Sequence, residues 1–273
     1  MNILICFKVV PDLNMLSDED WIVNANLEVD VSFARVILNC FDESAIEMGL
    51  KLRDEFQVSN SECYLTALTI GDESADLCLK TLNSLRFDKT VRVNNNKDLR
   101  FWPEIITEVI SQFASKVEEQ DVLLFGMQSD VGNNAKTPLL VAEKLGHPCI
   151  TQVIEITKDS NETLKVISLT DNGILKQTIT TPCVLSIGNA PKTYMRVPTL
   201  KDRMTYGKKP IEVLDLYDFD VSEILKVTYD TYKVKSLKKI NNKRESIIIK
   251  ETNSKENAQA LYNFYLKERL KQL

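Results

Sequence analysis

The fold is decided by the stretch DVLLFGMQSDVGNNAKTPLLVAEKLGHP, residues 121–148. Its apolar run Val122–Phe125 predicts a strand that is buried on both faces. The segment Pro138–Leu145 predicts a helix that Gly146 stops. The polar loop Gly126–Pro138 joins the two, and proline is tolerated at the first helical position. A buried strand that passes through a loop into a helix is the building unit of an α/β protein.

Strand-like and helix-like segments alternate in the same way through the first half of the chain. Further strands are expected at Ile3–Val10, Tyr64–Ile70 and Thr90–Val93, and helices at Glu43–Phe56, Glu73–Leu85 and Trp102–Val117. In the helix at Glu73–Leu85 the residues expected to face the core are Leu77, Cys78, Leu82 and Leu85. This repetition implies a mostly parallel sheet with flanking helices, whose ligands bind beyond the carboxyl ends of the strands.

The pattern changes after Ile150, where polar turns separate short apolar segments. Strands are expected there at Gln152–Ile156, Leu164–Leu169, Leu175–Ile179 and Cys183–Ile187. We interpret them as additional strands of the same sheet, with part of the run antiparallel.

The C-terminal part of the chain is weakly patterned and includes the basic stretch Lys233–Lys250. A helix is expected from Ser254, with apolar residues along one side at Ala258, Leu261, Tyr262, Tyr265 and Leu266. Such a tail has too little apolar surface to fold alone, so we expect it to lie on its own domain or on a partner. The predicted organisation is therefore an α/β domain of residues 1–213, including a long loop at 189–210, and a C-terminal arm of residues 214–273.

Composition and charge disfavour several classes of protein. The net charge of -5 gives no reason to expect nucleic acid or an acidic membrane as a partner. The N-terminus lacks the features of a signal peptide and no apolar run is long enough to span a membrane, so we expect a cytoplasmic protein with no membrane insertion. The 6 cysteines include no C-x-x-C pair and are expected to be buried thiols in a reducing cytosol. A helix-ending turn explains the single histidine, His147, better than a zinc site or a catalytic triad does.

Two loop-to-helix junctions are candidates for phosphate binding. Asn39 is a good helix N-cap, and Asp42 stands where a capping box has its glutamate. Local sequence favours a plain helix start there, and the functional alternative is that the amides of residues 41–43 face a ligand. The loop Gly126–Pro138 enters its helix with free N–H groups and a positive dipole end, which suits a phosphate. Its spacing excludes a Walker A loop, and an ordinary strand-to-helix turn remains the alternative.

The segment Arg196–Lys209 reads RVPTLKDRMTYGKK, a long polar loop with the isolated Leu200. Its basic residues are Lys201, Arg203, Lys208 and Lys209, which are commonly just a solvated face. Long irregular loops in compact domains nevertheless tend to be functional.

Taken together, these pieces resemble the β subunit of electron-transfer flavoprotein. The opening ILICFKVVPD (3–12) resembles the family's first strand and its Lys-x-Val-Pro-Asp turn. Further similar stretches follow in the family's order: NCFDESAIEMGLKLRDE (39–55), LTALTIGDESA (65–75), LLFGMQSDVGNNAKTPLLVAEKLGHP (123–148) and VPTLKDRMTYGKKPIEV (197–213). The resemblance runs from Met1 to about Val213 and more loosely to the end of the chain.

The resemblance implies an α/β fold related to adenine-nucleotide hydrolase-like domains and an electron carrier that is not itself an enzyme. Such a β subunit pairs with an α subunit that carries the redox FAD, and it holds AMP or, in electron-bifurcating members, a second FAD. A flavin dehydrogenase of the acyl-CoA type or another type would reduce the complex. A quinone oxidoreductase or a ferredoxin would accept the electrons, and the C-terminal arm would pack on the α subunit.

By position, the resemblance also implies site residues. The nucleotide pocket would be lined by Cys6, Asn39, Cys40, Phe41, Asp42, Ile70, Gly126, Gln128, Gly132, Asn133, Asn134, Lys136 and Thr137. Leu200 falls where the family anchors a partner dehydrogenase, and the turn at Pro11, Asp12 and Leu13 would approach the flavin ring. No catalytic residue and no metal ligand are implied.

The sequence also departs from the family. Cys40 replaces the usual proline, Met127 stands where lysine is common, and a lysine-rich stretch is thinned to Lys208-Lys209. These departures leave the identity of the nucleotide open. Two alternatives therefore stand: a bifurcating complex with a second FAD, and a stand-alone nucleotide-binding module of the stress-protein or hydrolase-like kind.

Overall fold

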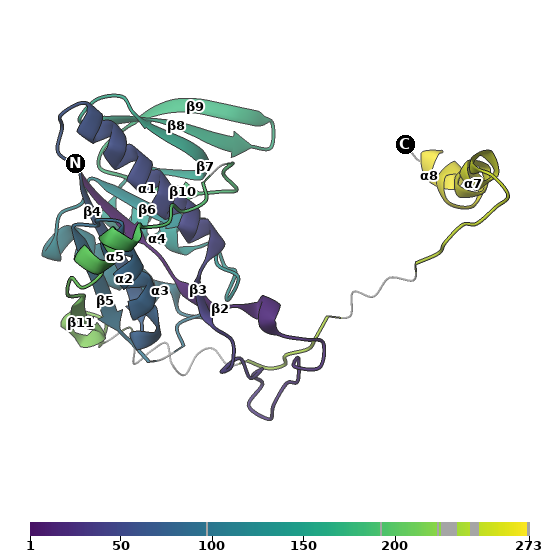
Figure 1. Cartoon of the computed structure of the whole chain (residues 1–273), viewed down its shortest axis with the longest axis horizontal. Coiled ribbons are helices and arrows are strands. Elements are labelled where there is room, and N and C mark those ends of the chain that lie inside the picture. Colours follow the sequence, from purple (N-terminus) through teal and green to yellow (C-terminus); the bar gives the residue numbers. More distant parts are fainter. Residues whose placement is uncertain (97, 192, 223, 225–233, 241–245, 272–273) are drawn as a thin grey trace. The chain divides into compact units, whose positions relative to one another are not determined.

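The computed structural model describes residues 1–96, 98–191, 193–222, 224, 234–240 and 246–271. They form two compact units, Met1–Lys235 and Ser236–Leu273 (Figure 1). Lys233 and residues 241–245 of the expected basic stretch lie outside the described residues.

The first unit is built on a nine-stranded sheet with the order β11-β5-β4-β1-β6-β10-β7-β8-β9. Neighbouring strands from β11 to β7 pair in parallel, whereas β7, β8 and β9 pair antiparallel. The strands are β1 (Asn2–Cys6), β4 (Tyr64–Gly71), β5 (Lys89–Asn94), β6 (Val122–Gly126), β7 (Cys149–Lys158), β8 (Thr163–Thr170), β9 (Gly173–Thr180), β10 (Cys183–Ile187) and β11 (Glu212–Asp215). This arrangement confirms the predicted α/β class and the partly antiparallel additions.

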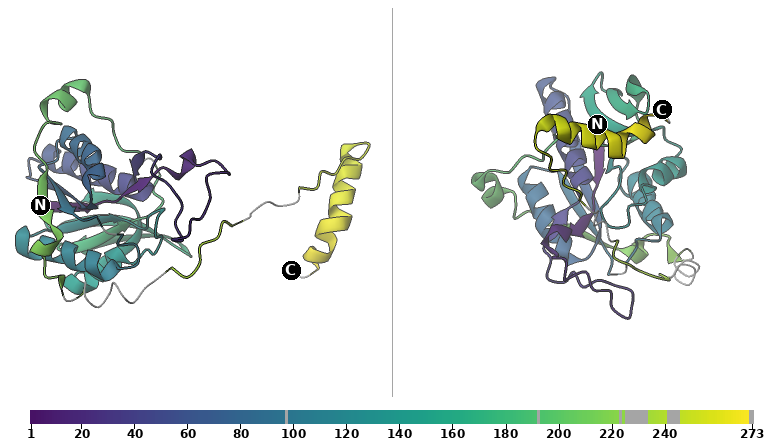
Figure 2. Two further views of the ribbon diagram at one scale, coloured as in Figure 1. Left: turned by 90° about the horizontal axis from the view of Figure 1, so that it is seen from below. Right: turned by 90° about the vertical axis from the view of Figure 1, so that its right-hand side faces the viewer.

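Helices cover both faces of the sheet (Figure 2). They are α1 (Cys40–Val58), α2 (Asp76–Ser84), α3 (Pro103–Gln112), which the π-helical turn η3 (Phe113–Val117) continues, and α4 (Thr137–Leu145). Ile3 and Ile5 of β1 join the core beneath α1 and α2, while Leu4 and Cys6 join the core beneath α3 and α4. Because successive side chains of a strand point to opposite faces, a strand covered on both sides is apolar throughout, as the sequence indicated.

The prediction of one strand over Ile3–Val10 is wrong. The first strand of the large sheet ends at Cys6, and β2 (Val9–Pro11) pairs antiparallel with β3 (Val36–Leu38) in a separate ribbon. Between the two strands, the backbone N–H of Lys8 donates to the Asp42 carboxylate (2.9 Å). At this contact the chain leaves the large sheet, within a run that is apolar apart from Lys8.

The prediction of one helix over Glu73–Leu85 also needs correction. The chain first makes a short turn, η2 (Glu73–Ala75), which the Asp72 side chain caps at Ser74 N–H, and α2 begins only at Asp76. Leu82 and Leu85 are buried and Cys78 packs against the core, as their spacing predicted, and Leu79 is buried with them. Leu77 is 74% exposed, so for this residue the prediction is wrong.

The loop expected at 189–210 contains the short helix α5 (Leu200–Thr205), capped by the Thr199 side chain. After this loop, β11 pairs in parallel with β5, so the expected boundary after Val213 falls inside a strand. Leu216, Phe219 and Val221 continue into the core beneath α3. These residues therefore belong to the first unit.

The second unit contains the expected C-terminal helix, in the pieces α7 (Ser254–Leu261), η5 (Tyr262–Leu266) and α8 (Lys267–Leu270). The Asn253 side chain caps it by accepting from the N–H groups of Lys255 and Glu256. None of its described residues is buried, and Leu261, Tyr262, Tyr265 and Leu266 leave an apolar stripe exposed.

Candidate functional site

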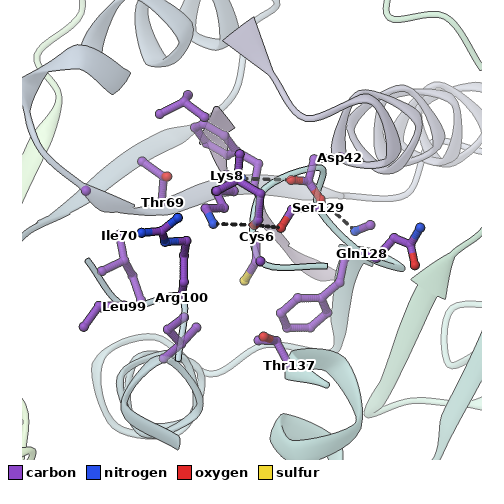
Figure 3. Close-up of a pocket in the computed structure, with 18 of the residues that line it drawn as sticks. Cys6, Lys8, Asp42, Thr69, Ile70, Leu99, Arg100, Gln128, Ser129 and Thr137 are labelled. Atoms are coloured by element: carbon purple, nitrogen blue, oxygen red, sulfur yellow. Dashed lines mark hydrogen bonds between the residues drawn. The ribbon is translucent and has the colours of Figure 1, made fainter. Parts of the chain in front are cut away.

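A cavity of about 610 Å³ opens at the carboxyl ends of the central strands (Figure 3). Strand β1 lies between β4 on one side and β6 on the other, so the direction in which strands are added reverses at β1. Open α/β sheets bind ligands at such a switch point. The volume lies within the range of small-molecule sites, about 300–1,000 Å³.

The cavity brings together part of the predicted pocket. The predicted residues that line it are Cys6, Asp42, Ile70, Gly126, Gln128, Gly132, Asn134, Lys136 and Thr137, together with Pro11 from the turn expected near the flavin. The predicted residues that do not line it are Asn39, Cys40, Phe41 and Asn133, together with Asp12 and Leu13.

Asp42 is the buried polar centre beside this cavity. Its carboxylate accepts hydrogen bonds from the backbone N–H groups of Lys8 (2.9 Å) and Gly126 (3.0 Å). Burial raises the pKa of Asp42 to about 7, although these two N–H groups, the Asn39 side chain and the Lys8 charge all act to lower it. The first turn of α1 is thereby joined to the ends of β1 and β6.

The expected capping box at Asn39 is not formed. Asn39 occupies the N-cap position of α1, but its side chain makes no cap hydrogen bond and instead donates to the carbonyl of Gln128 (2.8 Å). The amides of Asp42 and Glu43 donate to the Asn39 carbonyl (3.0 Å each), so they do not face a ligand as the functional alternative required. Asn39 thus holds the loop after β6 without lining the cavity itself.

The loop that enters α4 has an unusual backbone. Gly132, Asn133 and Ala135 all have positive φ values, of 97°, 44° and 52°. Gly132 and Asn133 are adjacent, and the Asn133 N–H donates to the Ser129 carbonyl (3.2 Å), so this hydrogen bond closes the loop on itself. Strained conformations of this kind also cluster at functional sites.

Sequence reasoning missed several polar residues that line the cavity, among them Lys8, Thr69, Asp98 and Arg100. Lys8 donates through Nζ to the Val131 carbonyl (3.0 Å), and burial lowers the pKa of its ammonium group, with Asp98 raising it and Arg100 lowering it. Figure 3 shows the ends of the Lys8 and Arg100 side chains near one another. Arg100 stands in the loop after β5, a strand end at which no site residue was expected.

Thr69 gives the cavity wall an unsatisfied polar group. Its side chain is 2% exposed, and its hydroxyl has no hydrogen-bond partner among the residues that the structure describes. A buried hydroxyl without a hydrogen bond costs about 1–3 kcal/mol. A ligand whose binding gave this hydroxyl a partner would remove that cost.

Part of the remaining wall is apolar, with the side chains of Leu68, Ile70, Leu99 and Phe125, and the rest includes the polar residues Asp72, Asn95 and Asp98. A flat ring fits against the apolar part. Because Asp98 pairs with Arg100 (2.6 Å), the groups that favour an anion are Lys8, Lys136 and the start of α4. The residues present therefore suit a nucleotide. Burial raises the pKa of Cys6 well above its ordinary value, with Asp42 adding to the effect, so its thiol stays protonated and is no nucleophile.

Within the part of the chain that the structure describes, no cluster of side chains could hold a metal ion. The search of those residues also finds no helix with the length and apolar character needed to cross a membrane.

The fold and the crevice define a doubly wound α/β protein with a ligand site at its switch point. Residues 31–219 match the family described as "Electron transfer flavoprotein domain", and the chain belongs to this family. The resemblance inferred from the sequence motifs is thereby confirmed.

Three relatives show the range of similarity. "Putative electron transfer flavoprotein subunit YgcR" of Escherichia coli (strain K12) is 29% identical over 272 residues, 99% of both chains. "Acryloyl-CoA reductase electron transfer subunit gamma" of Anaerotignum propionicum is 29% identical over 219 residues, 79% of this chain and 78% of that one. "Electron transfer flavoprotein subunit beta" of Bacillus subtilis (strain 168) is 27% identical over 223 residues, 82% of each chain.

Replacing Gly126 tests the close approach of β6 to α1. A Cβ atom at Gly126 would collide with the Asp42 carboxylate and would lie 2.8 Å from both the Asp42 nitrogen and the Phe41 carbonyl carbon. We expect Gly126→Ala to lower the free energy of unfolding in urea by about 1–3 kcal/mol. Gly71→Ala is the control, because a Cβ there meets nothing within 4 Å. Equal stability of the two variants would contradict this view of the junction.

The raised pKa of Asp42 predicts a pH dependence of stability. A carboxyl with a native pKa of about 7 binds its proton more tightly in the folded state than in the unfolded state, where 3.8 is usual. Its contribution to stability is therefore complete below about pH 4 and is lost as the pH rises to about 7. We expect urea unfolding of wild type and Asp42→Asn to show that the wild type loses stability relative to the variant across this window. If the difference in unfolding free energy between wild type and Asp42→Asn stayed constant across this pH range, the raised pKa of Asp42 would be refuted.

Proposed function

We propose that this chain is the β-type subunit of a heterodimeric electron-transfer flavoprotein and holds an adenine nucleotide, AMP or FAD, in the crevice. Membership of the family supports a role as an electron-transfer subunit. The relative from Bacillus subtilis, which is named a β subunit, supports the more specific assignment.

The observation that carries the nucleotide assignment is the combination of groups in one cavity. Lys8 and Lys136 bring positive charge, while Arg100 is paired with Asp98 (2.6 Å). Thr137 opens the helix α4, and Thr69 holds a hydroxyl without a partner among the described residues. Phosphates bind where a helix start and cationic side chains coincide, and the apolar wall would take the adenine ring. Asn39 and Asp42 would act by holding the loops in place.

In this proposal the chain supplies binding and electrostatics rather than acid–base chemistry. A flavin, when bound, carries the redox step, and the protein orients and tunes it. The FAD of the partner α subunit would receive electrons from a flavin dehydrogenase, of the acyl-CoA or another type, and pass them to a quinone oxidoreductase or a ferredoxin. The exposed apolar stripe of the C-terminal helix is suited to packing on the α subunit.

The docking surface for the dehydrogenase would lie around α5. Four large apolar side chains are exposed there, Tyr194, Val197, Leu200 and Met204, and we call them the docking face. Tyr194 (90% exposed) and Val197 (78%) are at least as exposed as Leu200 (74%), so they would serve as further apolar anchors beside the one that the sequence singled out. A few apolar anchors ringed by polar residues are typical of an interaction hot spot.

The composition of the purified protein tests the proposal. Co-expression with its α subunit should yield a yellow heterodimer that contains an adenylate in addition to the redox flavin, measured by absorbance and chromatography after denaturation. One FAD with one AMP would identify a simple carrier, and two FAD would identify a bifurcating arrangement. A colourless homodimer that binds ATP or AMP would instead establish the stand-alone nucleotide-binding module.

Thr137→Ala is expected to weaken nucleotide retention, because the hydroxyl at the start of α4 lines the cavity. Loss of one hydrogen bond corresponds to a change in affinity of up to about tenfold. Asn39→Ala should act in the same direction by freeing the loop at Gln128. The measurement is the nucleotide-to-protein ratio after gel filtration. Unchanged ratios in both variants would count against this assignment.

Leu200→Ala is expected to raise the KM for the partner dehydrogenase about tenfold while leaving the flavin content unchanged, since it removes an apolar anchor. Val197→Ala should have a comparable effect, and Leu77→Ala, an equally exposed leucine on α2, should have none. The assay follows flavin reduction by the dehydrogenase. Parallel loss of flavin and activity would contradict the docking role.

A further inference from the structure

The segment that leads into α5 alternates inward-facing and outward-facing residues. Thr193 is buried, and its hydroxyl lies 2.9 Å from the hydroxyl of Ser44 on α1. Met195 packs against the core and Pro198 is buried, whereas Tyr194 and Val197 are 90% and 78% exposed. Water opposes the exposure of these two apolar side chains. A further interaction is therefore expected to hold the backbone in this orientation.

Arg196 supplies that interaction. Its backbone N–H donates to Glu47 Oε2 (3.0 Å), its Nη2 donates to Glu47 Oε1 (2.9 Å), and its Nη1 donates to Asp54 Oδ2 (2.7 Å). The Glu47 side chain is only 6% exposed, so solvent screens this ion pair little. A planar guanidinium that meets two carboxylates in this way also fixes direction, which a lysine ammonium would not.

The anchoring partners all belong to one stripe of α1. Ser44, Glu47 and Asp54 recur at helical spacing and hold residues 193 and 196 from the same side. Farther along, the Arg86 guanidinium, which lies just after α2, pairs with Asp202 of α5 (2.9 Å). The docking face is thus held at both ends by a rigid part of the first unit.

We propose that Arg196, clamped by Glu47 and Asp54, is the positioning residue of the docking face, and that it presents Tyr194, Val197 and Leu200 preformed to the partner dehydrogenase. This inference rests on the docking role proposed above. Without the ion pairs of Arg196 with Glu47 and Asp54, which we call the clamp, the apolar side chains would pack onto the protein's own surface. The partner would then have to displace them from that surface before binding, which would lower its affinity. A preformed face binds more tightly because less ordering is required on contact.

The test compares Arg196→Gln, Arg196→Lys and Glu47→Gln in the full-length chain with its α subunit. Lys165→Gln is the matched control, because it also removes one cation from an ion pair, with Asp159, at a distant turn. Hydrogen exchange of the amides in residues 196–207 reports the order of the segment directly. The probe for docking is an acyl-CoA-type dehydrogenase with its acyl-CoA substrate, which gives kcat and KM for flavin reduction.

The clamp predicts that Arg196→Gln accelerates exchange in this segment by about tenfold and raises the KM by a similar factor, with kcat within about twofold of wild type. Arg196→Lys should fall in between, because it keeps one ion pair. The double variant Arg196→Gln/Glu47→Gln should have a smaller effect than the sum of the two single variants, since the side chains act partly through each other and the backbone N–H of residue 196 still donates to Glu47 in Arg196→Gln.

Three results would overturn the inference, and they separate it from the docking role. Unchanged exchange in Arg196→Gln would show that no clamp operates. Faster exchange with an unchanged KM, while Leu200→Ala still raises the KM, would show that docking does not need the clamp. An unchanged KM in both Arg196→Gln and Leu200→Ala would remove the docking role itself.

Discussion

The crevice depends on the buried carboxylate of Asp42. It accepts the N–H groups of two residues far apart in the sequence, Lys8 and Gly126, and so joins the first turn of α1 to the ends of two central strands. Because β6 approaches α1 this closely, only a residue without a side chain fits at Gly126. The loop after β6 then lies over the start of α1, where the Asn39 side chain holds it by the Gln128 carbonyl. One carboxylate thus fixes where the sheet ends and where the cavity begins.

The elements of this fold were largely predictable from the sequence because most are marked by local signals. Val122–Gly126 and Cys183–Ile187 are mostly apolar runs of strand length, and Gly146 ends α4 in a left-handed conformation, with φ 68°. The break at Lys8 was not predicted, because the apolar run resumes after this lysine and the acceptor of its N–H, Asp42, lies in another segment. The start of α2 was placed three residues early, since the capped turn at Asp72 comes before the helix.

Part of the predicted residue set lies around one cavity, for reasons that follow from topology. Cys6, Ile70 and Thr137 lie at strand ends or helix starts, which parallel sheets bring to one edge. Asn39 was misjudged because its side chain serves a loop 89 residues away rather than its own helix. To predict Arg100 as a cavity residue, one would have to know that the loop after β5 lies over the cavity. To predict Thr69, one would have to know which face of β4 is turned towards the cavity. The pairing of Arg196 with Glu47, 149 residues apart, is equally invisible to local patterns.

The two margins of the sheet differ in a way that limits self-association. Strand β9 spans eight residues and exposes Ile174 and Leu175, whereas β11 on the opposite margin has four residues and carries Glu212 and Asp215 at its ends. Unpaired edges recruit other strands, and short acidic ones resist it. Of the described strands, β9 is therefore the margin at which the sheet can be extended, and the exposed charge of Lys176 in its middle is what opposes the addition of a further strand there.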